Sequence, residues 1–466
     1  MNKLENLIER MKDDIVKSTQ ELIKIKSVED EAKPGMPFGE GVNQALEYSL
    51  QLGRKLGLKA ENVDGYAGHI EYGEGDEIVA VLVHLDVVPE GKNWTYPPYG
   101  GEIHNGKIYG RGAIDNKGPA VACIYGLKAI KDSGLKLNRR IRIILGTDEE
   151  SGWKGIKYYF DKIKEKPVCG FSPDAEYPII NREKGILVFK MVKDLTGENQ
   201  GSIAVKSIKG GDRPNVVPDY CEAVLEIKSG KDAFLEAFEE YKNQGEADIE
   251  IDRENQNYII KSRGKSAHGS LPHKGKNAIT QLFGFLSKLD SIEGDTGEII
   301  KFVSQKIDDE HDGKSLGIDL EDDVSGKLVF NLGTISLDEK RCELGINIRY
   351  PVTFTEKDVL ERLKETLKPY SIKIADVEHK KPLFVPEDNF LVKKLQKVYK
   401  EVTGKEPYLI AIGGGTYARA IENAVAFGPL FPGQEELAHQ KDEHISIDDL
   451  ITNAKIYARA MYELAK

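Results

Sequence analysis

Two short apolar runs in this chain each end in acidic or imidazole side chains. The run 78–83 is followed by His84 and Asp86, and the run 140–145 leads into a turn that contains Glu149 and Glu150. Both runs are rich in β-branched residues and have the length of strands, which predicts buried strands. Because α/β sheets bind their ligands at the carboxyl ends of the strands, these two ends are candidate functional positions.

Helical spacing alternates with the apolar runs in the first part of the chain. Apolar residues recur at helical intervals over 4–24, and further helices are expected over 43–58 and 119–133, the last with a proline in its first turn. Helices that alternate with buried strands predict an α/β catalytic domain with a mostly parallel sheet covered by helices.

The middle of the chain has a different pattern. Strands are expected at 221–227, 258–262, 328–335 and 343–349, and helices at 233–242, 278–289 and 356–367. Paired strands with helices between them predict an inserted α+β lid domain with two similar halves. The acidic stretch 293–323 has no clear periodicity and is expected to be a solvated excursion.

The alternating pattern returns after Pro386, with a helix at 389–403, a strand at 424–427 and a final helix from Ile447. Acidic and imidazole side chains that are candidates for one functional site lie both before and after the middle region. They can form one site only if the two ends of the chain fold into one domain. We therefore expect a discontinuous catalytic domain, 1–186 and 382–466, with a lid and substrate-binding domain at 187–381.

Bulk composition limits the partners and the compartment. The 466 residues are 40% hydrophobic and 31% charged, with a net charge of −11, which argues against nucleic acid or an anionic membrane as a partner. The four cysteines lack paired spacing, so buried free thiols are expected. The first residues form an amphipathic pattern with acids where a signal peptide needs an apolar core, and no apolar run is long enough to span a membrane, which predicts a cytoplasmic protein.

Three further motifs add candidate metal ligands. They are Asp115 in GRGAIDNKG, Asp174 in FSPDAEYP and His439 in LAHQKDEH. Two histidines and several carboxylates form a mixed nitrogen and oxygen set that suits zinc, manganese or cobalt, and the remaining carboxylates suit general-base chemistry. The set predicts a metal-dependent hydrolase. Each motif alone has a plainer interpretation, such as a solvated Glu-Glu turn or a helix cap at Asp115.

The ordered motifs HLDVVP, GRGAIDNKG, TDEESG and SPDAEYP, with a late histidine, resemble the co-catalytic di-metal amidohydrolases. That family includes carboxypeptidase G, aminoacylase and succinyl-diaminopimelate desuccinylase. Within it the chain is most similar to the PepV-type dipeptidases, through FSPDAEYP, SAHGSLPHKGKNA, GGGTYAR and LAHQKDEHI. The resemblance covers essentially the whole chain.

The resemblance implies a role for each motif residue. Asp115 would bridge two divalent ions, zinc or manganese with cobalt also possible, and the terminal ligands would be His84, Glu150, Asp174 and His439. Glu149 would be the general base. Asp86 would orient His84, as carboxylates commonly orient ligating imidazoles.

The resemblance also assigns residues in the lid region. His268 in SAHGS would polarise the scissile carbonyl, and Asn215 and Arg349 would bind the substrate's C-terminal carboxylate. The plainer interpretations are a surface histidine and a strand-end ion pair. The backbone of Gly413, Gly414, Gly415 and Thr416, ahead of an expected helix at 417–423, is a candidate anion site, with phosphate binding as the rival use.

These features predict a cytosolic metallo-dipeptidase that hydrolyses short L-dipeptides, including β-alanyl and Xaa-His types. The alternative with the same chemistry is an N-acyl amino acid deacylase or desuccinylase. A more remote alternative is a non-catalytic, metal-stabilised binding protein. The expected partner is a small dipeptide. Simpler members of the family have one compact lid unit and often dimerise; by analogy, the doubled lid would supply His268 from the same chain, so a monomer is expected, with a homodimer as the alternative.

Overall fold

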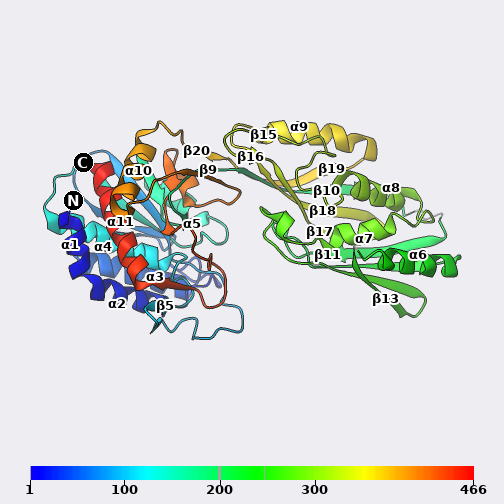
Figure 1. Cartoon of the computed structure of the whole chain (residues 1–466), viewed down its shortest axis with the longest axis horizontal. Coiled ribbons are helices and arrows are strands. Elements are labelled where there is room, and N and C mark those ends of the chain that lie inside the picture. The colour runs from blue at the N-terminus through cyan, green and yellow to red at the C-terminus, as the bar shows by residue number, and fades with distance from the viewer. Residues whose placement is uncertain (1, 198–200, 246) are drawn as a thin grey trace. The chain divides into compact units, whose positions relative to one another are not determined.

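The computed structural model describes residues 2–197, 201–245 and 247–466 and divides the chain into two compact units (Figure 1). Unit 1 consists of Met1–Arg182, Leu383–Ala411 and Gly415–Lys466, and unit 2 of Glu183–Pro382 and Ile412–Gly414. The sequence predicts domain boundaries at 186/187 and 381/382, and the boundaries between the two units in the structure lie at 182/183 and 382/383. The return of residues 412–414 to unit 2 has no counterpart in the sequence pattern.

Unit 1 is built on a sheet whose centre is parallel. The strands β6, β3, β7 and β22 run parallel to one another, whereas β2 pairs antiparallel with β6 and with β1 on one side and β9 pairs antiparallel with β22 on the other. In sheet order the strands are β1 (Lys59–Val63), β2 (Ala67–Tyr72), β6 (Arg140–Gly146), β3 (Ile78–His84), β7 (Cys169–Ser172), β22 (Ala424–Ala426), β9 (Ile179–Glu183) and β20 (Leu383–Phe384), and β21 (Leu409–Ile412) also pairs with β9. The carboxyl ends of the central strands therefore lie at one edge.

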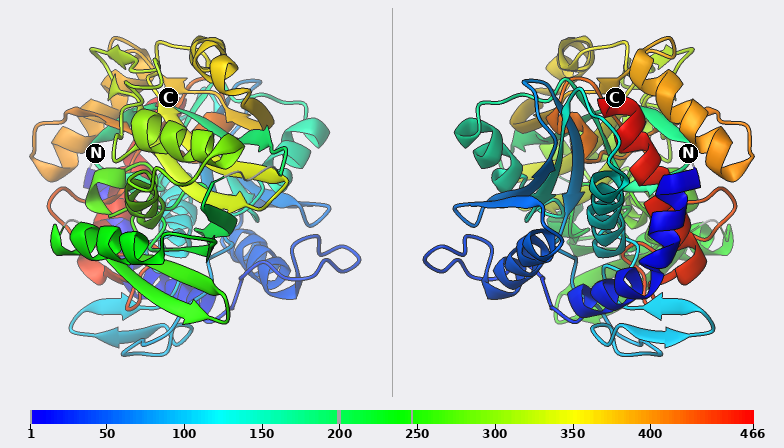
Figure 2. Two further views of the ribbon diagram at one scale, coloured as in Figure 1. Left: turned by 90° about the vertical axis from the view of Figure 1, so that its right-hand side faces the viewer. Right: turned by 90° about the vertical axis from the view of Figure 1, so that its left-hand side faces the viewer.

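Helices cover this sheet because its central strands are apolar on both faces. Every residue of β3 is buried. The helices α4 (Lys117–Ser133), α11 (Ile447–Ala465), α1 (Asn2–Arg10) and α2 (Lys12–Ile23) pack against one another, and α4 and α11 contact β3. The first and last helices lie side by side (Figure 2). The helices α3 (Glu40–Lys55) and α5 (Lys154–Lys162) contact β2 instead.

Shorter elements of unit 1 carry the loops of the later motifs. A small sheet joins β4 (Glu102–His104), β5 (Lys107–Tyr109) and β24 (His444–Ser446), and β8 (Ala175–Glu176) pairs with β23 (Pro429–Leu430). Helix α10 (Phe390–Thr403) follows the return of the chain from unit 2. All four cysteines are free and buried, as predicted.

Unit 2 contains one eight-stranded sheet that both halves of the insertion share. One side of the sheet consists of β13 (Asp248–Glu254), β14 (Asn257–Arg263), β12 (Tyr220–Ile227) and β11 (Ile203–Gly210), all from the first half of the insertion. The other side continues in the order β17 (Val329–Leu337), β18 (Arg341–Tyr350), β10 (Gly185–Asp194) and β19 (Lys373–Lys380), so β10, the first strand of the insertion, lies between two strands of the second half. The accompanying helices are α6 (Lys231–Asn243), α7 (Ala278–Leu286) and α9 (Glu356–Leu367).

The prediction of a solvated excursion over 293–323 is wrong for residues 294–307 and for the buried apolar residues that follow them. It forms α8 (Gly294–Phe302) and a π-helical turn (Val303–Ile307) before the short strand β15 (Glu321–Asp322). Its sparse apolar residues are buried in the core of unit 2: Ile299, Ile300, Phe302, Val303, Ile307, Leu316, Ile318 and Leu320. The helix is short and Gly-rich and its register changes at the π turn, so no regular period is visible in the sequence.

The prediction of a helix at 417–423 is also wrong. Only a 3₁₀ turn forms, Tyr417–Ala420, and the Thr416 side chain accepts a hydrogen bond from the Ala418 N–H at 3.2 Å. The chain is already extended at Ile421, just before β22. A four-residue turn has little of the summed dipole of a long helix, so the anion-site argument for this loop is weakened.

Among the residues that the structure describes, no helix combines the length and the apolar character of a membrane span.

The fold predicts a pH-dependent loss of stability at His69 on β2. His69 is 7% exposed, and burial, together with the positive charge of Arg142, lowers its pKa from 6.5 to about 4. The unfolded chain therefore binds more protons between pH 6.5 and 4, and stability falls as the pH decreases through this window. When the pH falls from 7 to 4, the free energy of unfolding of wild type should decrease by about 3 kcal/mol more than that of His69→Gln, because each unit of pKa shift corresponds to about 1.36 kcal/mol.

Urea unfolding in the presence of a chelator measures this difference. Trp94 and Trp153 both lie in unit 1, so fluorescence reports on the relevant unit. The partly exposed His104→Gln serves as the matched control and should follow wild type. Equal pH dependence in wild type and His69→Gln would show that His69 titrates normally.

Candidate metal centre

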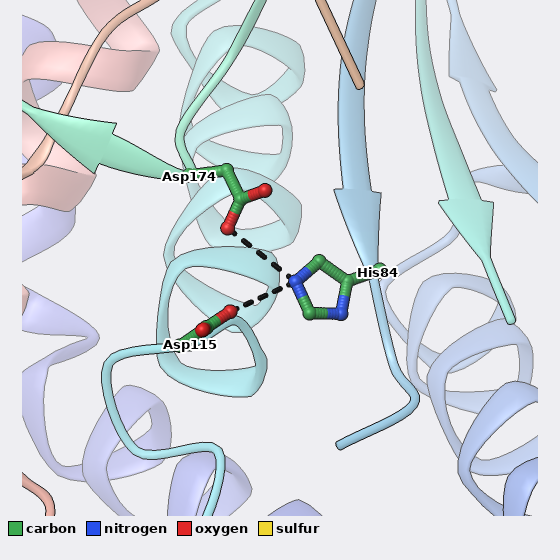
Figure 3. Close-up of side chains that lie close together, drawn as sticks. All are labelled: His84, Asp115 and Asp174. Carbon is green, nitrogen blue, oxygen red and sulfur yellow. Dashed lines mark hydrogen bonds and ion pairs between the residues drawn. The ribbon is translucent and has the colours of Figure 1, made fainter. Parts of the chain in front are cut away.

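Three side chains from different segments of unit 1 converge at the carboxyl end of β3 (Figure 3). The Nε2 atom of His84 lies 2.9 Å from Asp115 Oδ1 and 3.4 Å from Asp174 Oδ1. His84 ends β3, Asp115 precedes α4, and Asp174 follows β7. The His84 side chain is 1% exposed, so its ring is held by packing as well as by these contacts.

A second group shares one residue with the first. The Nε2 atom of His439 lies 2.9 Å from Glu150 Oε1 and 3.2 Å from Asp115 Oδ2. Asp115 thus turns one carboxylate oxygen toward each imidazole. The donor atoms in each group of three lie within 4.8 Å of one another, which is close enough for each group to surround one cation.

The parallel centre of the sheet explains why these residues meet. Strands β3, β6 and β7 are neighbours, and their carboxyl ends deliver His84, the Glu149-Glu150 turn and Asp174 to the same edge. His439 comes from the loop between β23 and β24 and has a φ of 64°. A non-glycine residue in this region is uncommon, and it indicates that the surrounding contacts fix the loop.

Asp86 contacts His84 through its backbone as well as through its side chain. The Nδ1–H of His84 donates to the backbone carbonyl of Asp86 at 3.0 Å, whereas the Asp86 carboxylate lies 3.5 Å from Nδ1. The other carboxylate oxygen accepts from the Glu150 N–H at 3.0 Å. With Nδ1 bonded to this carbonyl, Nε2 is the ring nitrogen that faces Asp115 and Asp174 and that would be available to a metal. Asp86 therefore connects the ligands of both groups.

Glu149 precedes Glu150 in the turn after β6 and interacts electrostatically with Asp174 and His84, but it belongs to neither group of three. Its backbone carbonyl accepts a hydrogen bond from the Trp153 indole at 2.8 Å, which holds the turn. Burial, and next the negative charge of Asp174, raise the pKa of Glu149 well above 4.5. A carboxyl with a raised pKa is a candidate general base.

The donor set fits divalent cations. Burial and the neighbouring carboxylates raise the pKa values of Glu150 and Asp174, the latter to about 7, because several acids share this site with only two imidazoles. Concentrated negative charge of this kind is costly unless cations compensate it. Mixed imidazole and carboxylate ligands suit zinc, manganese and cobalt. The residues present can therefore hold two cations, with Asp115 common to both.

The lid residues predicted from the sequence lie close together within unit 2. Val216 and His268 form a β-bridge, and the Gly269 N–H donates to the Asn215 carbonyl at 2.8 Å. His268 is exposed, and its Nδ1 accepts from the Ser270 N–H at 3.2 Å and lies 2.6 Å from Ser270 Oγ. Nδ1 is thus an acceptor, so in the neutral ring Nε2 carries the proton and is a donor.

Arg349 and the glycine loop also meet in unit 2. The Arg349 guanidinium is buried, and it donates to the Gly413 carbonyl at 2.9 Å and to Asn347 Oδ1 at 3.0 Å. A Cβ on Gly413 would lie 2.9 Å from the Ser270 Cβ, so the loop packs against the His268 segment. Gly414 belongs to the same unit, and Gly415 and Thr416 belong to unit 1.

Several residues at the site have no distinctive sequence signal of their own. Each lies inside or a few residues beyond one of the motifs, and only its hydrogen bonds mark it as part of the site: Arg111, Asn116, Trp153, Ser270 and Glu443. The signal that could have found Arg111 and Glu443 is an unassigned charge inside each of the motifs GRGAIDNKG and LAHQKDEHI; their side chains are 2% and 0% exposed.

The comparisons with known proteins agree with this geometry. A family model described as Peptidase family M20/M25/M40 matches residues 80–463. The chain belongs to this family. YtjP of Bacillus subtilis (strain 168), which is provisionally named a dipeptidase, is 46% identical over 465 residues that cover 98% of each protein.

Two solved structures are similar over nearly the whole chain. The M20 family metallo-carboxypeptidase Sso-CP2 from Sulfolobus solfataricus has a TM-score of 0.59 at 19% identity and covers 97% of this chain and 99% of its own. Human carnosine dipeptidase 1 has a TM-score of 0.56 at 18% identity and covers 99% of both chains. The predictions of the fold class, of the family and of a metal-dependent peptidase are confirmed.

The crowded carboxylates predict opposite effects of Asp174→Asn with and without metal. Above pH 7 the metal-free wild type must keep the Asp174 carboxylate charged in a site that raises its pKa to about 7. The substitution should therefore stabilise the metal-free protein at pH 8, by up to about 4 kcal/mol for a shift of three pKa units. It should also remove most of the stabilisation that added Mn²⁺ gives wild type, about 4 kcal/mol at 1,000 times the Kd.

Thermal unfolding at pH 8, with chelator and then with Mn²⁺, measures both effects. The exposed Asp132→Asn on α4, remote in sequence from both groups, should behave as wild type in each condition. If Mn²⁺ stabilises Asp174→Asn as strongly as wild type, then Asp174 is not a metal ligand.

Proposed function

We propose that the chain is a metallo-dipeptidase that hydrolyses the amide bond of short L-dipeptides, including β-alanyl and Xaa-His types. The observation that carries this proposal is the position of Asp115 between two donor groups, with Glu149 beside them and outside both. That arrangement provides ligands for two cations and a separate base. The dipeptidase name of YtjP and the carnosine dipeptidase fold support the choice of substrate.

The proposed cofactors are two divalent ions, zinc or manganese, with cobalt as a further possibility. His84 and Asp174 would hold one ion and Glu150 and His439 the other, with Asp115 between them. Such ions lower the pKa of a water molecule toward neutrality and polarise a carbonyl oxygen. A site that contains this many carboxylates would gain stability from the positive charge.

Glu149 has the properties that the proton transfers require. Its position outside the ligand groups leaves its carboxylate available, and its raised pKa makes it a strong enough base to take a proton from water. The same group then carries that proton to the leaving amine. The Trp153 indole holds the turn and so limits the motion of Glu149 between the two transfers.

The lid residues would bind the rest of the substrate. The Nε2–H of His268 is a donor for the oxyanion that develops on the scissile carbonyl, an interaction worth roughly 3–4 kcal/mol in the barrier. Asn215 and Arg349 would bind the C-terminal carboxylate together with the backbone of the 413–416 loop, whose Gly413 carbonyl accepts a hydrogen bond from Arg349. We further propose that the protein acts as a cytoplasmic monomer.

Substrate specificity and the base are tested together. Metal-stripped protein reloaded with Zn²⁺ or Mn²⁺ should cleave free dipeptides and leave N-acetyl and N-succinyl amino acids intact. Glu149→Ala should lower kcat by about 10²–10⁴-fold, the usual contribution of a general base. Its metal content should remain that of wild type, because Glu149 is not a ligand.

The exposed Glu422→Ala is the matched control and should retain full activity. Turnover of the N-acyl amino acids in place of dipeptides would identify a deacylase or desuccinylase. Bound metal with no turnover of either class would identify a binding protein. Full dipeptidase activity in Glu149→Ala would disprove the assigned base.

A further inference from the structure

A buried ion pair next to the metal centre has no part in the proposed chemistry. Arg111 and Glu443 are almost fully buried, and the Arg111 guanidinium lies 2.7 Å from Glu443 Oε2. Isolated buried charges are very costly, so the pair depends on the hydrogen bonds that complete it. Every one of those bonds goes to a loop that flanks the donor groups.

Glu443 holds the loop that carries Asp115. Its second carboxylate oxygen, Oε1, accepts from the backbone N–H of Ile114 at 3.0 Å and of Asp115 at 3.1 Å. The Glu443 carbonyl also accepts from the Gly110 N–H at 2.9 Å. Three backbone donors of this loop therefore depend on one residue of the 440–443 segment.

Arg111 holds the loop that carries His439. It donates to the Gln440 carbonyl at 3.2 Å, directly after His439, and to the Glu90 carbonyl at 3.4 Å. The guanidinium also lies over the Trp94 ring, 5.2 Å from its centroid. The pair thus joins the backbone on both sides of the Asp115–His439 contact.

The first donor group has separate supports. The Asn116 side-chain amide donates to the Pro173 carbonyl at 2.6 Å and to Asp174 Oδ1 at 3.2 Å. His84 is held by the Asp86 carbonyl. Apart from the shared Asp115, the members of the first group, His84 and Asp174, make none of the hydrogen bonds to Arg111 or Glu443 found among the described residues.

We propose that Arg111 and Glu443 are positioning residues for the second cation, the one held by Glu150 and His439. This inference rests on the proposed two-metal function. Without the pair, the second group loses support for both His439 and Asp115, whereas the first loses it for Asp115 alone. Loss of a residue that orients metal ligands typically costs 10–100-fold in affinity, and we expect that loss at the second site.

Titration of the metal-free protein with Mn²⁺ tests the proposal without any activity measurement. Calorimetry should show that wild type binds two ions, and its electron paramagnetic resonance spectrum should show the spin-coupled signal of paired Mn²⁺. Glu443→Gln should bind the first ion within a few-fold of wild type and the second about 10–100-fold more weakly. Its spectrum at limiting Mn²⁺ should be that of isolated ions.

Two further variants separate positioning from general destabilisation. Glu71→Gln removes one partner of the buried Arg142–Glu71 pair of unit 1, on the β2 and β6 strands, and should bind both ions as wild type does. Asn116→Ala should weaken the first ion more than the second. If Glu443→Gln does not fold, the neutral double variant Arg111→Met/Glu443→Leu removes both charges and should show the same selective loss.

The proposal would be overturned if Glu443→Gln bound each ion as tightly as wild type does, or if it bound both ions more weakly by the same factor. Failure of wild type to bind a second ion would instead contradict the two-metal function on which it rests. The two failures are therefore distinguishable in one set of titrations.

Discussion

The rest of the site depends on the two contacts that the Asp115 carboxylate makes, one with each histidine. One oxygen lies 2.9 Å from His84 and the other lies 3.2 Å from His439, so a single side chain fixes the separation of the two donor groups. The histidines come from distant parts of the sequence. The first and last segments of the chain must therefore fold into one unit, and the long insertion between them has to form a separate one.

The negative charge gathered around Asp115 explains the supporting contacts. Burial and mutual repulsion raise the pKa values of Glu149, Glu150 and Asp174, so charging these carboxylates in the folded, metal-free protein costs free energy. Backbone N–H groups, the Asn116 amide and the Arg111–Glu443 pair hold the ligands in place against this repulsion. The free-energy cost of charging the carboxylates favours cation binding, because a bound divalent ion relieves it.

Much of this arrangement is predictable from the sequence because strand ends carry a local signal. The apolar runs that end at His84 and at the Glu149-Glu150 turn form the buried strands β3 and β6, and helix α9 has the expected bounds. The helix α8 and the 3₁₀ turn after Thr416 were not predictable, because tertiary burial and a single side-chain cap determine them. Arg111 and Glu443 act through backbone atoms of other loops, so their sequence neighbours give no sign of it.

The most direct test of the account is the anomalous scattering of a crystal grown with Mn²⁺. Two peaks about 3.5–4 Å apart are expected, the separation typical of two-metal sites, with one Asp115 oxygen at each. His84 and Asp174 should lie at one peak and Glu150 and His439 at the other. A single peak, or two peaks without Asp115 between them, would contradict the central role of this carboxylate.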